Sequence, residues 1–270
     1  MREKALQIAN QQETEQNKLN YLREYRQQVI LREMFEMDLL GELVFHGGTA
    51  LRIIHDLNRF SEDLDFHLDE PDENYSVASN LNELRRRLGL NGYEVEVSSP
   101  SGGNVRGTMV KFAGGLLYEA GISPHENQKL SIKLKIDTNP PFGFETDTSL
   151  LNQYFPLALT YHDLETFLAG KCYAILGREW TKGRDFFDLL FYLTRWKEIT
   201  PNFEYLNNAL EQTGYKGSAI EEDNWKERIL GRVQEVQWST VEEDVEPFLL
   251  DRGDLKAFRK DFLVEELNEC

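Results

Sequence analysis

The chain has 270 residues, of which 40% are hydrophobic and 11% aromatic, enough to bury a core in one large domain or two small ones. Its formal net charge of −17 argues against a protein whose whole surface binds nucleic acid, because phosphate binding requires clustered Lys and Arg. A local basic patch stays compatible with this charge.

The start of the chain has no apolar signal-like segment, and no window approaches the length of a membrane span. Cys172 and Cys270 lie far apart in the sequence and lack metal-ligand spacing, which predicts a reducing compartment. We therefore expect a cytoplasmic protein without a membrane partner.

The first part of the chain alternates between helical and strand-like patterns. Apolar spacing predicts a helix from about Glu13 to Leu40, ended by Gly41. Residues 43–46 then predict a short strand, residues 49–57 a short helix and residues 63–68, DLDFHL, an alternating strand. The sequence therefore indicates a strand, helix and strand in quick succession.

Residues 77–88 predict a further helix, and three strand-like segments follow it: YEVEVSS, VRGTMVKF and LSIKLKID. The pattern of residues 116–122 is ambiguous, and residues 155–161 form one more apolar piece. From Asp163 the pattern is helical almost to the end, with predicted helices at residues 163–176, 185–196, 203–212 and 224–236 and two more before Cys270.

These patterns predict an α+β fold in which an N-terminal mixed sheet with flanking helices precedes a C-terminal helical bundle. The change from mixed to helical pattern falls between Tyr154 and His162. We therefore expect one domain at residues 1–155 and a second, helical domain at residues 156–270.

Asp63 and Asp65 are the first candidate functional residues. In a strand they project to the same face, while Leu64 and Phe66 point to the other. Two carboxylates held so close repel one another unless a positive charge lies between them. Hard divalent cations such as Mg²⁺ suit that position, because they prefer oxygen ligands and keep substrate phosphates in their shell.

A glycine pair and a later acidic strand extend this candidate site. Gly47 and Gly48, at the junction of a strand and a helix, can bring backbone N–H groups close to a phosphate, and Thr49 can add a hydroxyl. In LSIKLKID one face carries Lys135 and Asp137. If that strand lies beside Asp63 and Asp65, three carboxylates could hold metal for an in-line phosphoryl displacement.

Five segments in this order, FHGGTAL, RFSEDLDF, KID, LAGKCYA and RDFFDL, resemble the AbiEii/AbiGii toxin family within the DNA polymerase β-type nucleotidyltransferases. This family supplies the toxins of type IV toxin–antitoxin and abortive-infection systems. The resemblance covers roughly residues 40–193 and implies a nucleotidyltransferase-like sheet, with the helical domain contributing to the nucleotide cleft.

Carried over to this sequence, the resemblance implies that Asp63 and Asp65 bind metal and are catalytic together with Asp137. It implies nucleotide binding by Gly48 and Thr49, to which we add Gly47 and Ser61. Lys135 and Asp137 match the K-x-D/E element of the family, Lys171 matches the lysine of its third motif, which faces the triphosphate, and Asp185 and Asp188 match its fourth. The implied cofactor is Mg²⁺ or Mn²⁺, and the implied substrate is an NTP.

Structural roles compete with these assignments. Asp185 follows Gly183 and Arg184 and suits a helix N-cap, so we assign capping to Asp185 and a catalytic function to Asp188. Arg59 and Ser61 fit either a phosphate contact or a role in holding the loop. The spacings of His46, His55 and His67 match no zinc pattern and favour structural histidines.

The predicted function is the transfer of a nucleoside monophosphate from an NTP to an RNA acceptor, with tRNA as the leading choice. We expect no tight antitoxin complex, and an antitoxin that is a winged-helix regulator encoded nearby. Two alternatives stay open: a transferase acting on a small molecule such as an aminoglycoside, and a catalytically inactive module that binds nucleotide or protein.

Basic residues outnumber acidic ones between Lys171 and Lys197, the stretch where the acidic chain turns locally positive.

Overall fold

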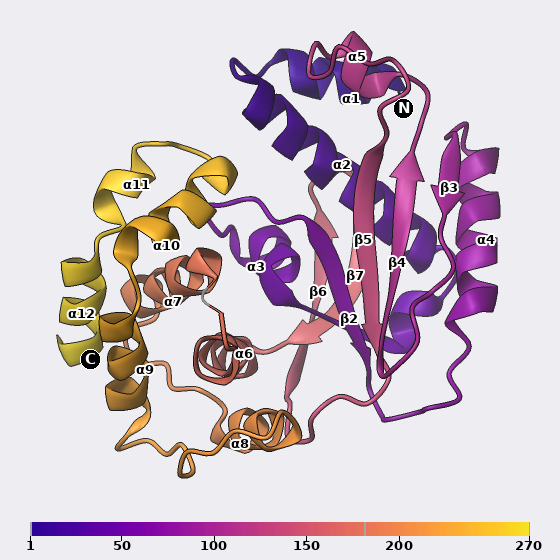
Figure 1. The fold of residues 1–270 in the computed structure, drawn as a ribbon. Coiled ribbons are helices and arrows are strands. Elements are labelled where there is room, and N and C mark those ends of the chain that lie inside the picture. Colours follow the sequence, from indigo (N-terminus) through magenta and orange to yellow (C-terminus); the bar gives the residue numbers. More distant parts are fainter. Residues whose placement is uncertain (1, 181, 270) are drawn as a thin grey trace. The chain divides into compact units, whose positions relative to one another are not determined.

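A computed structural model of the chain describes residues 2–180 and 182–269 (Figure 1). The chain divides into two compact units, each described here by itself. Unit 1 comprises Met1–His55, Phe60–Pro140 and Thr148–Tyr161, and unit 2 comprises Asp56–Arg59, Pro141–Asp147 and His162–Cys270. The short segments Asp56–Arg59 and Pro141–Asp147 thus belong to the helical unit. A single boundary in the sequence cannot describe this division, because both segments precede residue 156.

One mixed sheet of seven strands is the centre of unit 1 among the described residues, which confirms the α+β class. Its strands are β1 (Leu43–His46), β2 (Asp63–Leu68), β3 (Val95–Val97), β4 (Val105–Phe112), β5 (Leu130–Asp137), β6 (Thr146–Asn152) and β7 (Pro156–His162). Their order across the sheet is β3-β4-β5-β2-β1-β7-β6. β2 pairs in parallel with β5 and antiparallel with β1, while β1 pairs in parallel with β7.

The pairing of β2 with β5 is the feature that positions the candidate site. Asp63 lies opposite Lys133, Asp65 opposite Lys135, and His67 opposite Asp137. Because side chains alternate along a strand, these six residues share one face of the sheet. The adjacency that the sequence analysis required of these two strands is confirmed.

The opposite face of β2 and β5 is apolar and fully covered. Leu64, Phe66, Ile132 and Leu134 are all buried there. The long helix α2 packs against β5, and its Arg26 lies over the ring of Phe112 at the end of β4. Burial of this face leaves the other face of the same strands to carry the charged residues.

Six helical segments accompany the sheet in the described part of unit 1. They are α1 (Arg2–Asn10), α2 (Glu15–Phe35), the 3-10 helix η1 (Leu39–Gly41), α3 (Gly47–His55), α4 (Val77–Leu90) and α5 (Leu116–Glu119). The predicted helix ending at Leu40 is too long, because α2 ends at Phe35 and Asp38 adopts a left-handed φ of 55°. A residue in that conformation cannot continue an α-helix.

Three further differences from the predicted elements concern the start of α3, the additional strand β6 and the place of β7. α3 begins at Gly47, so the glycine pair forms its first turn instead of preceding it. β6 (Thr146–Asn152) follows the NPPFG turn and was not predicted. β7, whose residues fall after the predicted boundary at 155, pairs with β1 in the sheet.

Unit 2 is built from helices that follow Asp163. They are α6 (Leu164–Gly177), α7 (Gly183–Arg195), α8 (Phe203–Gln212), α9 (Trp225–Glu235), α10 (Trp238–Val245), the 3-10 helix η2 (Glu246–Phe248), α11 (Asp254–Ala257) and α12 (Lys260–Glu269). α6 packs against α7, α8 and α9, and α7 also packs against α10 and α12. The side chain of Asp163 caps α6 by accepting the N–H of Thr166, so the predicted start of this helix is confirmed.

None of the helices in the described part of the chain combines the length and the apolar character that crossing a membrane requires. Cys172 is a buried free thiol on α6, and burial raises its pKa. Cys270 lies outside the described residues.

Two glycines of unit 2 give a matched test of helix packing. A Cβ on Gly183, at the start of α7, would lie 2.1 Å from the carbonyl oxygen of Val241 on α10, whereas a Cβ on Gly231, in α9, would meet nothing within 4 Å. We predict that Gly183→Ala lowers the free energy of unfolding by about 1–3 kcal/mol, because the two helices must separate. Gly231→Ala should raise it by about 0.5–1 kcal/mol, because alanine favours a helix interior.

Urea denaturation of the two variants beside the parent chain measures both changes. Equal effects of the two substitutions would contradict the close approach of α7 and α10.

Candidate active site

The ammonium of Lys135 lies between the carboxylates of Asp63 and Asp65. Lys135 Nζ is 2.5 Å from Asp63 Oδ2 and 2.9 Å from Asp65 Oδ1. The Asp63 side chain is 34% exposed and those of Asp65 and Lys135 somewhat less, so the group is open to a ligand without being fully solvated. The two acids that a strand places together are therefore held by one positive charge from the neighbouring strand.

Electrostatics keep this lysine charged. Burial alone would lower the pKa of Lys135, but the charges and hydrogen bonds of Asp65 and Asp63 outweigh burial and raise the pKa above its ordinary value. The ammonium in turn offsets the repulsion between the two carboxylates. The pair Asp63 and Asp65 is thus a place that binds a cation.

The backbone conformation and the crowding around position 47 explain why this residue is a glycine. Gly47 has a φ of +78°, and a Cβ there would lie 2.9 Å from Asp65 Oδ2. Only glycine combines the left-handed backbone with so close an approach to a carboxylate. The start of α3 therefore lies directly against the Asp65 side of the candidate site.

The other two predicted phosphate-binding residues of this turn are buried. Gly48 lies in the first turn of α3, and the hydroxyl of Thr49 donates a hydrogen bond to the carbonyl oxygen of Asp63. Thr49 thereby ties α3 to β2 at the first acid of the pair. Its hydroxyl has a structural partner in this arrangement, and the backbone of the turn is the group available to a phosphate.

Asp137 lies on the same face as Asp63 and Asp65, at the end of β5 and opposite His67. Its carboxylate accepts the N–H of Asn139 at 2.9 Å, and burial raises its pKa above the ordinary value. Among residues 2–180 and 182–269, no three His, Cys, Asp or Glu side chains are grouped closely enough to hold one metal ion. The pair Asp63 and Asp65 is therefore brought together, whereas Asp137 shares their face without joining them in one ligand group.

The pair itself fits a divalent cation. It offers hard carboxylate oxygens, it already holds one cation, and it is partly exposed, so substrate oxygens and water can complete a coordination shell. Mg²⁺ and Mn²⁺ both accept such ligands. Asp63 and Asp65 are thus the residues that would hold the ion.

Two histidines, His46 and His67, lie on the same face of the sheet. His46 lies opposite Asp65 and His67 opposite Asp137, with their ring centroids 5.2 Å apart. Burial, together with His46, lowers the pKa of His67 to about 3, and its Nδ1 is 2.7 Å from the carbonyl oxygen of Leu68. A neutral, hydrogen-bonded His67 agrees with the structural interpretation of the sequence.

The half-buried Ser61 is placed by a contact of its backbone. Its carbonyl oxygen accepts a hydrogen bond from Gln27 Nε2 of α2 at 3.0 Å. This bond holds the loop that leads into β2, so the loop-holding role considered for this residue has a physical basis.

In unit 2 a buried ion cluster surrounds Asp188 of α7. Arg59 Nε and Nη2 each lie 2.6 Å from one oxygen of Asp188, and Lys171 Nζ from α6 lies 2.6 Å from Asp188 Oδ2. The Asp188 side chain is 0% exposed. Burial favours its neutral form, but Arg59 and Lys171 outweigh burial and hold the pKa of Asp188 below its ordinary value.

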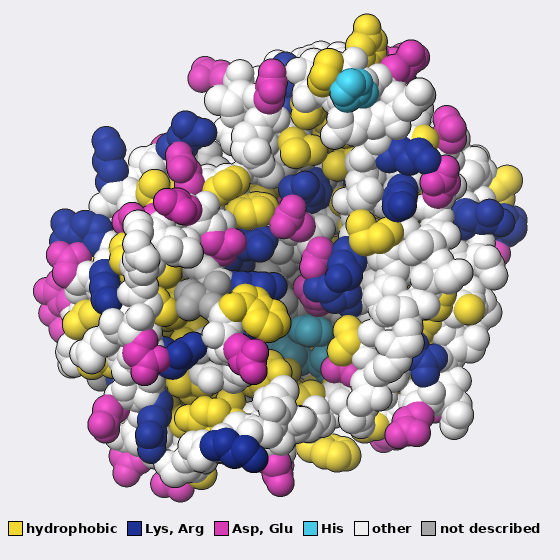
Figure 2. Space-filling model, viewed as in Figure 1, with side chains coloured by type: hydrophobic (Ala, Val, Ile, Leu, Met, Phe, Trp, Pro, Cys, Tyr) yellow, Lys and Arg dark blue, Asp and Glu magenta, His cyan; other side chains and the backbone are white. Residues whose placement is uncertain are grey.

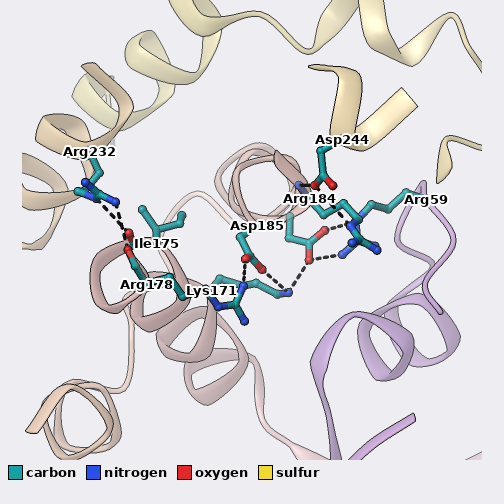
Figure 3. Close-up of polar contacts among 9 residues, drawn as sticks. Arg59, Lys171, Ile175, Arg178, Arg184, Asp185, Arg232 and Asp244 are labelled. Carbon is teal, nitrogen blue, oxygen red and sulfur yellow. Dashed lines mark hydrogen bonds and ion pairs between the residues drawn. The ribbon is translucent and has the colours of Figure 1, made fainter. Parts of the chain in front are cut away.

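Asp185 completes the same cluster. Lys171 Nζ is 3.3 Å from Asp185 Oδ1, and Arg178, just after α6, pairs with Asp185 Oδ2 (Figure 3). The assignment of Asp185 as an N-cap is wrong, because α7 begins at Gly183 and Lys182 occupies the N-cap position. Asp185 is instead a first-turn residue whose carboxylate faces the two cations.

The cluster contains three cations, Arg59, Lys171 and Arg178, and two carboxylates. Both oxygens of Asp188 are engaged, so Asp188 holds Lys171 and Arg59 in place and presents no free oxygen in this structure. The sequence analysis named Arg59 without its partner and missed Arg178 as a partner of Asp185. Arg59 and Asp188 are 129 positions apart, a pairing that no local pattern predicts, whereas Arg178 lies in the basic stretch that starts at Lys171.

Figure 2 shows acidic and basic side chains interspersed over one face of the molecule, without one continuous basic patch. This mixture agrees with the net charge of −17. Any contact with a polyanion would therefore rest on local groups of cations.

The fold is similar to those of two solved proteins from one organism. One is a candidate nucleotidyltransferase from H. pylori, with 19% sequence identity and a TM-score of 0.55 over 92% of this chain and 91% of that chain. The other is JHP933 from Helicobacter pylori, with 19% identity and a TM-score of 0.55 over 91% of this chain and 89% of that chain. At this level of identity the likeness concerns the fold alone.

No curated protein sequence matches the chain. Residues 29–268 match the family model described as "Nucleotidyl transferase AbiEii toxin, Type IV TA system". This match includes both acidic strands of unit 1 and the ion cluster of unit 2. The chain belongs to the AbiEii family of nucleotidyltransferase toxins.

Proposed function

We propose that this nucleotidyltransferase transfers a nucleoside monophosphate from an NTP to a hydroxyl of RNA, with tRNA as acceptor, in a reaction that depends on Mg²⁺ or Mn²⁺. The observation that carries the proposal is the pair Asp63 and Asp65, which holds a cation directly beside the glycine turn that starts α3. A helix start beside a cation-binding carboxylate pair suits a triphosphate, because it offers N–H donors and positive charge together.

In the proposed reaction the acceptor oxygen attacks the α-phosphorus of the NTP. The bond from that phosphorus to the oxygen bridging the β-phosphate breaks, and pyrophosphate leaves with the electron pair. A divalent ion bound to Asp63 and Asp65 would stabilise the charge that develops on the phosphate oxygens. Asp137, on the same sheet face, is our candidate for the base that accepts the proton of the acceptor hydroxyl.

Lys135 has two successive roles in this proposal. Without a divalent ion its ammonium neutralises Asp63 and Asp65. Once the two carboxylates bind another cation, the same ammonium is free to contact a phosphate oxygen of the substrate. This lysine therefore competes with metal and assists the nucleotide.

We assign Lys171 of unit 2 to the triphosphate on the strength of the family motif, with Asp188 and Asp185 as the carboxylates that orient it. Arg59 and Arg178 gather around the same carboxylates, and this group of cations supports the assignment, because an anionic ligand would find several donors there. The catalytic role assigned to Asp188 in the sequence analysis is thus proposed in a narrower form, as a positioning role.

The wider biological role follows from the family. We propose that the chain is the toxin of a type IV toxin–antitoxin or abortive-infection system, that it acts in the cytoplasm, and that its antitoxin is a winged-helix regulator encoded nearby which forms no tight complex with it. An antitoxin can neutralise a toxin without forming a complex with it if the antitoxin protects the toxin's target.

The acceptor is tested by incubating the folded protein with labelled NTPs, Mg²⁺ and total RNA, beside a parallel reaction with aminoglycosides. We expect label in the tRNA fraction alone. Label on the aminoglycoside alone would replace RNA by a small-molecule acceptor, and absence of label on every acceptor would overturn the transferase proposal for this chain.

Asp63→Asn should reduce nucleotide transfer by more than about 100-fold, because the variant loses one charged oxygen ligand and half of the cation-binding pair. Asp69→Asn is the matched control, since Asp69 lies exposed just beyond the end of β2. Its transfer rate should stay within about twofold of the parent. If Asp63→Ala still arrests growth when it is expressed in cells, toxicity does not depend on this site.

Lys135→Met should separate the two roles of the lysine. Without the competing ammonium, Mn²⁺ should bind the free protein at least about fivefold more tightly, as measured by the loss of its electron paramagnetic resonance signal. Nucleotide transfer should nevertheless fall by about tenfold or more, because a phosphate contact is lost.

Lys133→Met is the control, because Lys133 shares the strand and face but its Cε lies 3.5 Å from the Cβ position of Gly107 on β4. Its Mn²⁺ affinity should match that of the parent. Weaker Mn²⁺ binding in Lys135→Met would show that the ammonium does not occupy the place of the metal.

Asp188→Asn should lower the free energy of unfolding by about 3–5 kcal/mol, because it leaves Arg59 and Lys171 buried with one carboxylate fewer. Glu235→Gln, in an exposed pair with Arg232, should change it by less than about 0.5 kcal/mol. Urea denaturation at neutral pH measures both. Similar small changes in the two variants would show that the Asp188 cluster is not a buried ion network.

A further inference from the structure

A pocket of about 390 Å³ lies in unit 1, away from the carboxylate pair. Its lining comes from α1, α2, the turn between α4 and β3, and the end of β4 with the residues that follow it, and includes Arg2, Arg26, Tyr93, Glu94 and Phe112. Phe112 pairs with Leu130 at the beginning of β5, seven positions before Asp137, and both are buried on the apolar face of the sheet. The pocket and the candidate active site therefore belong to different faces.

Arg26 is the unusual residue of this pocket. It projects from the middle of α2, is only 4% exposed, and has no carboxylate partner among the described residues. Its Nε and Nη1 have no hydrogen-bond partner within the described chain. A buried guanidinium without a counter-ion is costly, because arginine keeps its charge where lysine or histidine would lose it.

Aromatic rings compensate for this burial only in part. The guanidinium lies 4.6 Å from the ring centroid of Tyr93, 5.0 Å from that of Phe112 and 5.8 Å from that of Tyr25. Such contacts use the face of the guanidinium, whereas its N–H groups donate in its plane. The rings and a hydrogen bond with the Tyr93 side chain therefore position Arg26 but leave its Nε and Nη1 without acceptors.

A second guanidinium borders the pocket. Arg2 of α1 pairs with Glu119 of α5 at 2.5 Å and is 45% exposed, and its Nη1 lies 3.2 Å from the Cβ position of Gly114. Burial lowers the pKa of Arg26, and the charge of Arg2 lowers it further. Two cations that repel one another across a pocket are stabilised together by one anion between them.

We propose that this pocket binds a small organic molecule through an oxyanion group, a carboxylate or a phosphate, which Arg26 and Arg2 hold between them. Its volume suits a ligand of metabolite size. Glu94 also lines the pocket, and its negative charge favours a singly charged oxyanion over a doubly charged one. The aromatic walls suit an apolar body behind the anionic group.

The test is isothermal titration calorimetry of the full chain with four sodium salts at equal ionic strength: inorganic phosphate, phenyl phosphate, benzoate and chloride. We expect saturable binding of one equivalent of phenyl phosphate or of benzoate. The tighter of the two identifies the oxyanion, and tighter binding of phenyl phosphate than of inorganic phosphate supports the apolar body. Heats equal to those of chloride for all the oxyanions would overturn the proposal.

Arg26→Met should weaken that binding by about tenfold or more, because the charged, forked donor is lost. Arg85→Met removes an exposed arginine of α4 in the same unit and should leave the affinity unchanged. Lys135→Met should also leave it unchanged, which separates this pocket from the site proposed for the NTP. Equal affinity of Arg26→Met and the parent would refute the assignment, as would loss of binding in Lys135→Met.

Two further measurements keep the test decisive if Arg26→Met folds poorly. Arg2→Met changes a half-exposed residue and should weaken binding by about threefold or more in a folded protein. The melting temperature of the parent should rise with added oxyanion, whereas that of Arg2→Met should rise less. Equal rises in both proteins would contradict an anion held between the two arginines.

Discussion

The structure of unit 1 depends on the neutralisation of two carboxylates held side by side. β2 places Asp63 and Asp65 on one face, and the parallel partner strand β5 supplies Lys135 between them. Without this ammonium the two negative charges would destabilise the strand pair. The same arrangement explains Gly47, whose missing side chain leaves room for the Asp65 carboxylate.

Unit 2 also holds charged side chains in place by ion pairing, but there the cations outnumber the carboxylates. Three cations share two carboxylates in a cluster buried between α6, α7 and the segment that carries Arg59. Arg59 and Lys171 engage both oxygens of Asp188, so Asp188 fixes the positions of these two cations. In each unit a lysine named by a family motif is held by carboxylates, and a competing ion or an anionic ligand would release it.

Arg26 shows the opposite situation, a buried cation whose carboxylate is missing. Its aromatic neighbours hold its position but leave donors without acceptors. The chain carries an excess of acidic residues, yet none of the described carboxylates pairs with Arg26. The proposed ligand would therefore supply the acceptors that Nε and Nη1 of Arg26 lack.

Local pattern determined much of this protein. The alternation of DLDFHL and LSIKLKID defined β2 and β5 with their bounds, and Asp163 marked the start of α6, because side-chain period and capping are short-range properties. Tertiary structure alone decided the pairing of Arg59 with Asp188, the place of Lys135 between two acids, the position of Asp185 inside α7 and the separation of Asp137 from the carboxylate pair. These features depend on strand register and on contacts between distant segments, and no spacing within one segment encodes them.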